Sequence, residues 1–184
     1  MANYNNDPQR LARDMKNPIL AEYHDEFGQK VTDTNTLFER LMTHVYAIGL
    51  KWETIVPKMP DYEKLFYNYD VNKVAGMSED EVFEKIADYP NVIDNQGKIK
   101  ATLSNARTIR DLEVNGTKFI DYLTGLVPGD VVISTHEQNE KVTTQISEQM
   151  KKDGFKYTGP STVSTFFHGI GLLPLFSQLD NVNE

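Results

Sequence analysis

The stretch between Gly97 and Arg110 carries four basic residues and no acidic one, in a chain whose formal net charge is −8. Those basic residues are Lys98, Lys100, Arg107 and Arg110. In a helix that follows a tight turn, the unpaired N–H groups of the first turn and the helix dipole favour a phosphate group. The alternative is an ordinary solvated helix face, which charge patterning alone favours. The stretch is therefore a candidate phosphate site that needs support from elsewhere in the chain.

The single tryptophan of the chain, Trp52, follows a segment with helical periodicity. The apolar residues that share one helical face are Leu37, Leu41, Met42, Val45 and Ile48. Asp33 and Thr34 suit the start of this helix, and Gly49 is a natural stop. The face of an electron-rich ring can hold a flat cation, although an aromatic residue at a helix end can also simply close a core.

The composition limits the class of protein. A chain of 184 residues with 39% hydrophobic and 25% charged residues is typical of one globular domain. Residues 1–10 are polar and no apolar run approaches the length of a membrane span, so a cytoplasmic location is expected. The absence of cysteine excludes disulfides and thiolate metal sites. The acidic net charge argues against nonspecific coating of nucleic acid, but a DNA enzyme needs only a local basic stripe.

Capping signals and periodicity predict an all-α fold. Ser78 with Glu81, and Thr135 with Gln138, have the spacing of capping boxes. A long helix is expected from Lys98 to the Asn–Gly pair at residues 115–116, and shorter helices at residues 118–126 and 161–170. The only strand-like run, at residues 131–133, is short. A helix, a tight glycine-containing turn and a second helix are typical of a helix-hairpin-helix unit.

Several different short motifs are distributed along the chain from about Asn17 to Leu173. Residues 23–28 read Tyr-His-Asp-Glu-Phe-Gly, and the stretch at residues 37–52 begins with Leu-Phe-Glu and ends with Gly-Leu-Lys-Trp. Further motifs are Asp70-Val71-Asn72-Lys73-Val74-Ala75, Gly97-Lys98-Ile99-Lys100-Ala101, Asn105-Ala106-Arg107, Gly154-Phe155-Lys156-Tyr157 with Gly159, and Ile170-Gly171-Leu172. Together they resemble the 3-methyladenine DNA glycosylase I family, which carries Tyr-His-Asp-x-Glu-Trp-Gly and Gly-Leu-Ser-Trp at the corresponding places.

The resemblance implies base excision from double-stranded DNA, with free 3-methyladenine as product and no cofactor. A glycosylase must flip the damaged base into a pocket. By this resemblance Tyr23 and Trp52 sandwich the cationic base, Phe27 forms an apolar wall and Tyr46 reads the base. Ile48, Gly49 and Leu50 form the loop that wedges into the duplex. The hairpin residues Gly97, Lys98 and Lys100 hold the DNA backbone, so the phosphate interpretation of the basic stretch becomes the preferred one.

The chain departs from the family at the position where the resemblance implies a glutamate that hydrogen-bonds the base. This sequence has His44 there, which is assigned the catalytic position. A neutral imidazole accepts one hydrogen bond but lacks the negative charge that favours a cationic ligand. Glu39 is turned well around the helix, five residues earlier, whereas Glu53 is adjacent to Trp52 and within reach.

The resemblance also implies a zinc site that ties the two ends of the chain together in most of the family. Of its four ligands only His24 is present, and the other three positions are Leu11, Phe176 and Asp180. One histidine does not make a structural zinc site, so no metal is expected. A contact between Leu11 and Phe176 is predicted in its place.

The sequence thus predicts one helical domain at residues 17–173, an extended lead-in at residues 1–16 and a loose tail at residues 174–184. The leading interpretation is a monomeric glycosylase that acts on an alkylated purine. Three alternatives stay open: a module that binds DNA or a base without catalysis, a glycosylase with another lesion specificity, and a purely structural role.

Overall fold

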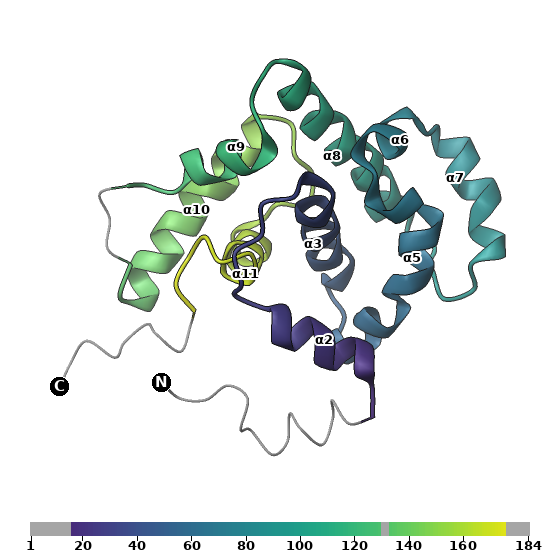
Figure 1. Ribbon diagram of the computed structural model, residues 1–184, viewed down its shortest axis with the longest axis horizontal. Helices are drawn as coiled ribbons and strands as arrows, with labels where there is room; N and C mark the ends of the chain where they lie inside the picture. The colour runs from purple at the N-terminus through teal and green to yellow at the C-terminus, as the bar shows by residue number, and fades with distance from the viewer. Residues whose placement is uncertain (1–15, 130–132, 176–184) are drawn as a thin grey trace.

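A computed structural model of the 184-residue chain describes residues 16–129 and 133–175, and Figure 1 shows these residues as a set of packed helices. The α-helices are α2 (Pro18–Glu26), α3 (Thr34–Ala47), α4 (Trp52–Ile55), α5 (Met59–Leu65), α6 (Val71–Gly76), α7 (Glu79–Lys85), α8 (Gln96–Val114), α9 (Phe119–Leu126), α10 (His136–Lys152) and α11 (Pro160–Gly169). Short 3₁₀ helices are η2 (Val56–Lys58), η3 (Tyr67–Tyr69) and η4 (Ile86–Asp88). No strand occurs in the described ranges, and the all-α prediction is confirmed.

Several predicted features lie outside the described residues. They are the lead-in at residues 1–15, the contact of Leu11 with Phe176, the tail beyond residue 175, and the first two residues of the strand-like run. The last residue of that run, Ile133, is described and is not part of a strand. The proposed domain limits therefore stay a prediction.

Side-chain caps fix the starts of the main helices. The Asp33 carboxylate accepts the Thr36 N–H at 2.8 Å at the start of α3, and Thr135 with Gln138 forms the complete predicted capping box of α10. Gly49 has φ +78° in the turn after α3, as its predicted stop role requires.

Helix α8 begins at Gln96, two residues before the predicted start at Lys98. The Asn95 side chain accepts the Lys98 N–H at 3.1 Å and caps the helix. Gly97 and Lys98 consequently lie inside the first turn of α8, after the loop that leads from η4. A helix, a loop and a helix still follow one another, because α7 and η4 precede this loop.

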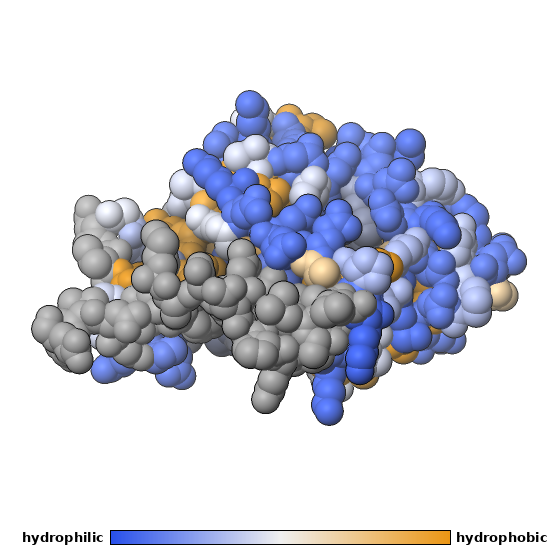
Figure 2. Space-filling view, turned by 60° about the horizontal axis from the view of Figure 1, so that its bottom comes forward, coloured by the Kyte–Doolittle hydropathy of each residue, from blue (hydrophilic) through white to orange (hydrophobic). Residues whose placement is uncertain are grey.

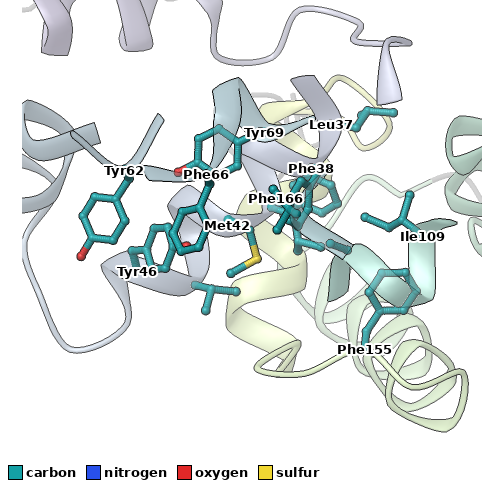
Figure 3. Close-up of a cluster of buried hydrophobic side chains, with 14 of the residues drawn as sticks. Leu37, Phe38, Met42, Tyr46, Tyr62, Phe66, Tyr69, Ile109, Phe155 and Phe166 are labelled. Atoms are coloured by element: carbon teal, nitrogen blue, oxygen red, sulfur yellow. The ribbon is translucent and has the colours of Figure 1, made fainter. Parts of the chain in front are cut away.

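Helices α3 and α11 pack against each other at the centre of the fold, with α5 to α8 on one side and α9 and α10 on the other (Figure 1). Figure 3 shows Met42 of α3 between the aromatic group of Phe66 and Tyr46 and the ring of Phe166 from α11. Met42 and Phe166 are fully buried. This core fixes α3, whose last turn enters the candidate site.

The two ends of the described chain meet beside α11. The Gly28 N–H donates to the Gly169 carbonyl at 2.8 Å, and the Val31 N–H donates to the Ile170 carbonyl at 3.3 Å. The loop after α2 is thereby attached to the end of the last helix. One wall of the site consequently comes from both ends of the described chain.

The helix pair α10 and α11 contains a buried polar network. The imidazole Nε2 of His168 lies 3.0 Å from the Asn139 side-chain oxygen, and the Asn139 amide donates to the Ser164 hydroxyl at 3.1 Å. His168 is fully buried. These bonds satisfy polar groups that are buried between the two helices.

Hydrophilic residues predominate on the face shown in Figure 2, where hydrophobic residues form small separate patches. Among the residues that the structure describes, none of the helices combines the length and the apolar character needed to cross a bilayer.

Candidate functional site

Three residues predicted from separate motifs meet at the end of α3. His44 lies in the last turn of this helix and is only 4% exposed. Its Nε2 atom lies 3.3 Å from the Tyr23 hydroxyl, and its ring stands edge-on to Trp52 with 5.0 Å between the centroids. The structure therefore brings together the predicted catalytic residue and the two predicted ring residues.

The rings of Tyr23 and Trp52 stack on each other. Their centroids are 5.0 Å apart and their planes are inclined by 26°. Two rings that sandwich a third must be about 7 Å apart, because each stacked contact needs roughly 3.5 Å. The predicted sandwich consequently requires the two rings to separate. A base can otherwise stack only on the ring faces that remain open.

Phe27, to which the resemblance assigns an apolar wall, lies close to these rings. Its ring centroid lies 6.2 Å from that of Tyr23. A Cβ atom at Gly169 would lie 3.0 Å from the Phe27 ring and 3.5 Å from Nε2 of His44. Glycine at the end of α11 therefore lets both side chains approach the helix backbone closely.

The His44 imidazole is neutral at physiological pH. Burial, and next the positive charge of Arg40, lower its pKa to about 3. The Arg40 guanidinium lies over the Tyr23 ring, 5.4 Å from its centroid, and pairs with Glu26. A neutral imidazole has one donor and one acceptor, so His44 offers a base hydrogen bonds without charge.

A pocket of about 310 Å³ opens beside His44 and Trp52. Its other walls are the loop at residues 48–50 and the first turns of α11, and its hydroxyl groups belong to Ser161, Thr162 and Thr165. The Thr165 hydroxyl donates to the Ser161 carbonyl at 3.0 Å, so its oxygen remains available only as an acceptor. The sequence analysis did not identify these hydroxyls. Gly159 and Pro160 indicate where a helix begins, but a helix start does not determine which face of α11 lines a pocket.

The described residues that line this pocket include no carboxylate. Glu53 lies in the first turn of α4, is exposed, and is not part of the lining. Glu39 lies at a different cavity, as expected from its position on α3. The structure thus supplies no direct replacement for the glutamate that the resemblance implies.

Tyr46 does not belong to this pocket, and its predicted base-reading role is not supported by its position. Its ring stacks on Tyr62 with 4.2 Å between centroids, and its hydroxyl lies 2.5 Å from the Thr102 hydroxyl. It is 2% exposed. The reason is helical geometry, since residues two apart on a helix point in nearly opposite directions. His44 and Tyr46 therefore cannot face the same pocket.

The predicted wedge loop is exposed and apolar at its tip. Ile48 and Leu50 are 40% and 41% exposed, on either side of Gly49. The Leu50 N–H donates to the Ala47 carbonyl at 2.8 Å, which shapes the turn. Two large apolar side chains that are held in water at the mouth of a pocket suit insertion between stacked bases.

The side chains of the basic stretch are already engaged within the protein. The Lys98 ammonium donates to the carbonyls of Tyr46 and Ile48 at 2.9 and 2.6 Å. Lys100 pairs with Glu79 at 3.0 Å. Both lysine side chains thus have partners within the protein, and the hold of Gly97, Lys98 and Lys100 on the DNA backbone stays a prediction.

The other two basic side chains of the stretch also have partners. Arg107 donates to the carbonyls of Ala75 and Met77 at 3.1 and 2.7 Å and so joins α8 to the end of α6. Arg110 pairs with its neighbour Asp111. All four basic side chains of the stretch thus have partners within the protein.

Gly97 lies in the first turn of α8, close to another segment. A Cβ atom at Gly97 would clash with the Tyr157 hydroxyl unless this side chain moved. Tyr157 is 44% exposed and its hydroxyl is the free end of the side chain. The glycine therefore lets the tyrosine hydroxyl lie close to the backbone of α8.

A separate cavity of about 370 Å³ is lined by Tyr23 but not by His44 or Trp52. Burial, and next the negative charges of Glu63 and Glu22, raise the pKa of Glu39 in this cavity to about 7. The carboxyl group is thus partly protonated at neutral pH in the folded protein.

We expect Glu39→Gln to stabilise the fold at pH 8 and to have little effect at pH 5. The pKa of Glu39 is about 7 in the folded state and 4.5 in the unfolded state. Between these two pH values the folded state binds more protons than the unfolded state does, so the free energy of unfolding falls as the pH rises through this range. The gain at pH 8 should be about 1–3 kcal/mol, measured by denaturant unfolding. Glu148→Gln is the control, since this residue is exposed on α10 and does not line this cavity. An equal effect of Glu39→Gln at both pH values would contradict the assignment.

No group of three or more His, Cys, Asp or Glu side chains suited to a metal ion occurs among the described residues. Three of the positions implied for zinc ligands, Leu11, Phe176 and Asp180, lie outside these residues. The expectation of no zinc therefore stays a prediction.

Comparison with known proteins gives the geometry a context. The chain is 31% identical over 165 residues to DNA-3-methyladenine glycosylase 1 of Escherichia coli strain K12, covering 86% of this chain and 88% of that protein. A crystal structure of a 3-methyladenine DNA glycosylase I has a TM-score of 0.75 and 30% identity, with 86% of this chain and 91% of the other covered. The 3-methyladenine DNA glycosylase I of Staphylococcus aureus, solved to explain 3-methyladenine recognition, has a TM-score of 0.73 and 29% identity, with 90% of each covered.

The sequence profile of the methyladenine glycosylase family matches residues 13–175, which include α3, α4 and α11 that line the pocket. With this match over most of its length, the chain belongs to the methyladenine glycosylase family.

Proposed function

We propose that this protein is a DNA-3-methyladenine glycosylase-like hydrolase that removes an alkylated purine from double-stranded DNA. The observation that carries the proposal is the contact of Tyr23 with His44 and Trp52, the last two of which line a pocket beside an exposed apolar loop. A flipped base needs a ring to stack on, a polar group at its edge and a side chain that fills its former place in the duplex. The site contains each of these.

The wedge loop and the pocket have complementary roles in base flipping. Ile48 or Leu50 occupies the gap that the base leaves, which lowers the free-energy cost of the bent duplex. The base itself enters the pocket of about 310 Å³ and stacks on Trp52. A cationic alkylated base gains further from the electron-rich ring face, because the pocket is partly desolvated.

The bond that breaks is the N-glycosidic bond between C1′ of the sugar and the base nitrogen. A water oxygen bonds to C1′, one water proton goes to the solvent, and the positively charged base leaves as neutral free base. A cationic base is a good leaving group, so exclusion of bulk water and correct placement supply much of the acceleration. His44, as a neutral group, holds the base edge by a hydrogen bond and does not repel a cationic base.

A second candidate function is binding of damaged DNA or of a free base without turnover. The absence of a carboxylate from the described lining of the pocket favours it, because a carboxylate would stabilise a cationic ligand. A glycosylase with a preference for another, uncharged lesion rests on the same observation.

The test is release of 3-methyladenine from methylated duplex DNA, measured by chromatography of the freed bases. We expect release by the unmodified chain, and equal release by Val114→Ala, a control whose side chain is 79% exposed at the far end of α8. Tight binding of an abasic duplex without release would support the second candidate. Neither release nor salt-dependent binding would overturn both.

We further propose that one copy of the chain acts alone, because every residue assigned to the pocket and to the wedge loop comes from the same chain. A cytoplasmic location stays a prediction from the sequence.

A further inference from the structure

The end of α3 leaves carbonyl groups that the helix itself cannot pair. The last four C=O groups of a helix lack an intrahelical partner and need another donor. Here the Lys98 ammonium donates to the carbonyls of Tyr46 and Ile48, at 2.9 and 2.6 Å. A cation also suits the negative end of the helix dipole, and charge-assisted bonds are stronger than neutral ones.

These two carbonyls belong to the base of the wedge loop. Ile48 carries one of them and is itself one of the two exposed apolar side chains of the loop. The loop continues through Gly49, whose φ is +78°, to Trp52 at the start of α4. Lys51, the residue before α4, has no side-chain capping bond. The Lys98 bonds are therefore a main external restraint on the position of the loop.

Lys98 also belongs to the segment, residues 97–100, for which the family resemblance predicts a hold on the DNA backbone. Its N–H is capped by Asn95 at 3.1 Å in the first turn of α8. A cavity of about 170 Å³ lies between the wedge loop and this region, and its lining includes Leu50, Ile93 and Lys98. Because this cavity separates the wedge loop from the start of α8, the hydrogen bonds of the Lys98 side chain connect the two segments across it.

We infer that Lys98 is a positioning residue that fixes the wedge loop to the start of α8, so that the grip on the DNA backbone sets the depth of the intercalating side chains. The inference rests on the proposed function and assigns Lys98 a different role from a phosphate contact. Two of the three N–H bonds of its ammonium group are directed to the loop carbonyls. Partial burial lowers the pKa of Lys98, as expected for an ammonium group that is turned into the protein.

The test compares Lys98→Met, which keeps an unbranched apolar stem and removes the ammonium, with Lys98→Arg, which restores charged donors. Both are measured for affinity to an undamaged duplex across a range of salt concentrations, and for base release in a single turnover. A 2-aminopurine next to the lesion reports base flipping. Lys141→Met is the matched control, because Lys141 is exposed on α10, on the other side of the fold from α8 in Figure 1.

We expect Lys98→Met to leave the salt dependence of undamaged-duplex binding unchanged. The 2-aminopurine signal and the rate of release should fall by about 10- to 100-fold, the usual result of misplacing a group by about 1 Å. Lys98→Arg should recover most of the flipping signal, which a general loss of folding stability would not explain.

Two results would overturn the inference. One is a decrease of about one in the slope of log affinity against log salt, with equal loss of affinity for damaged and undamaged duplexes, since this identifies a phosphate contact. The other is unchanged flipping and release in Lys98→Met. If the unmodified chain flips the base but releases nothing, the proposed catalysis fails while the flipping signal still tests Lys98.

Discussion

His44→Glu is expected to increase the release of 3-methyladenine from methylated DNA by about 30-fold or more. An ionic partner for a cationic ligand in a desolvated pocket contributes on the order of 2–4 kcal/mol, and each 1.4 kcal/mol corresponds to a factor of about ten. The Arg40 charge, which lowers the pKa of His44, also favours the ionised form of a carboxyl group at this position. The Tyr23 hydroxyl, 3.3 Å from the imidazole, is placed to donate to such a carboxylate.

The matched control for this variant is His44→Gln. Glutamine has nearly the same shape as glutamate and can hydrogen-bond the base, but it carries no charge. We expect it to release 3-methyladenine no faster than the unmodified chain does. The two variants together separate the effect of charge from the effect of shape. Equal rates for glutamate, glutamine and histidine would show that charge at this position does not limit the reaction.

The glutamate variant is also expected to be less stable. A carboxylate at a fully buried position loses hydration, whereas the imidazole there is already neutral. Thermal unfolding should therefore occur at a lower temperature for His44→Glu than for His44→Gln. A rise in activity with a fall in stability would be typical of a functional group at a buried site.

Trp52→Ala is the second change with a large expected effect, a decrease in base release of about 100-fold or more. The variant removes the ring on which the flipped base is proposed to stack, and a desolvated cation–π contact alone contributes about 2 kcal/mol. It also removes the partner of the Tyr23 ring, at 5.0 Å, and the edge contact of His44. The pocket would thus lose both its stacking surface and its geometry.

Trp52→Phe keeps a ring and should lose less activity, about tenfold, because the smaller ring has a weaker face. Trp52 is the only tryptophan of the chain, so intrinsic fluorescence reports on this site alone. Titration of the unmodified protein with free 3-methyladenine is expected to change this emission. An unchanged emission at saturating base, or full activity of Trp52→Ala, would contradict the placement of the base on this ring.

Local sequence signals predicted the elements that local interactions determine. Asp33, Ser78 and Thr135 begin helices because their side chains accept N–H groups three residues later, a rule that depends on neighbours only. The start of α8 was misplaced because Asn95, rather than a residue closer to Gly97, provides the cap. Both asparagine and glycine are acceptable at such a position, and the sequence does not decide between them.

The proximity of Tyr23 and Trp52 follows from motifs that assign both residues to one site. Tyr46 was assigned to the pocket by its place in a motif, although two positions along a helix from His44 turn it to the opposite side. The sequence assigns Lys98 to the DNA backbone, because it does not reveal that the Lys98 ammonium donates to carbonyls of residues about 50 positions away. The hydroxyls of α11 were missed for the same reason, since their relevance depends on how α11 packs against α3.

The attachment of the loop after α2 to the end of α11 has a consequence for how the protein is made. A nascent chain on a ribosome emerges from its N-terminus, and α2, α3 and α4 are therefore synthesised long before α11. The backbone bonds from Gly28 and Val31 to residues 169 and 170 form only when the last helix has left the exit tunnel. Until then the Tyr23, His44 and Trp52 side chains lack the wall that Gly169 and the α11 hydroxyls provide. Unfinished chains are consequently expected to have no competent pocket, and base excision begins only with chains that extend through α11.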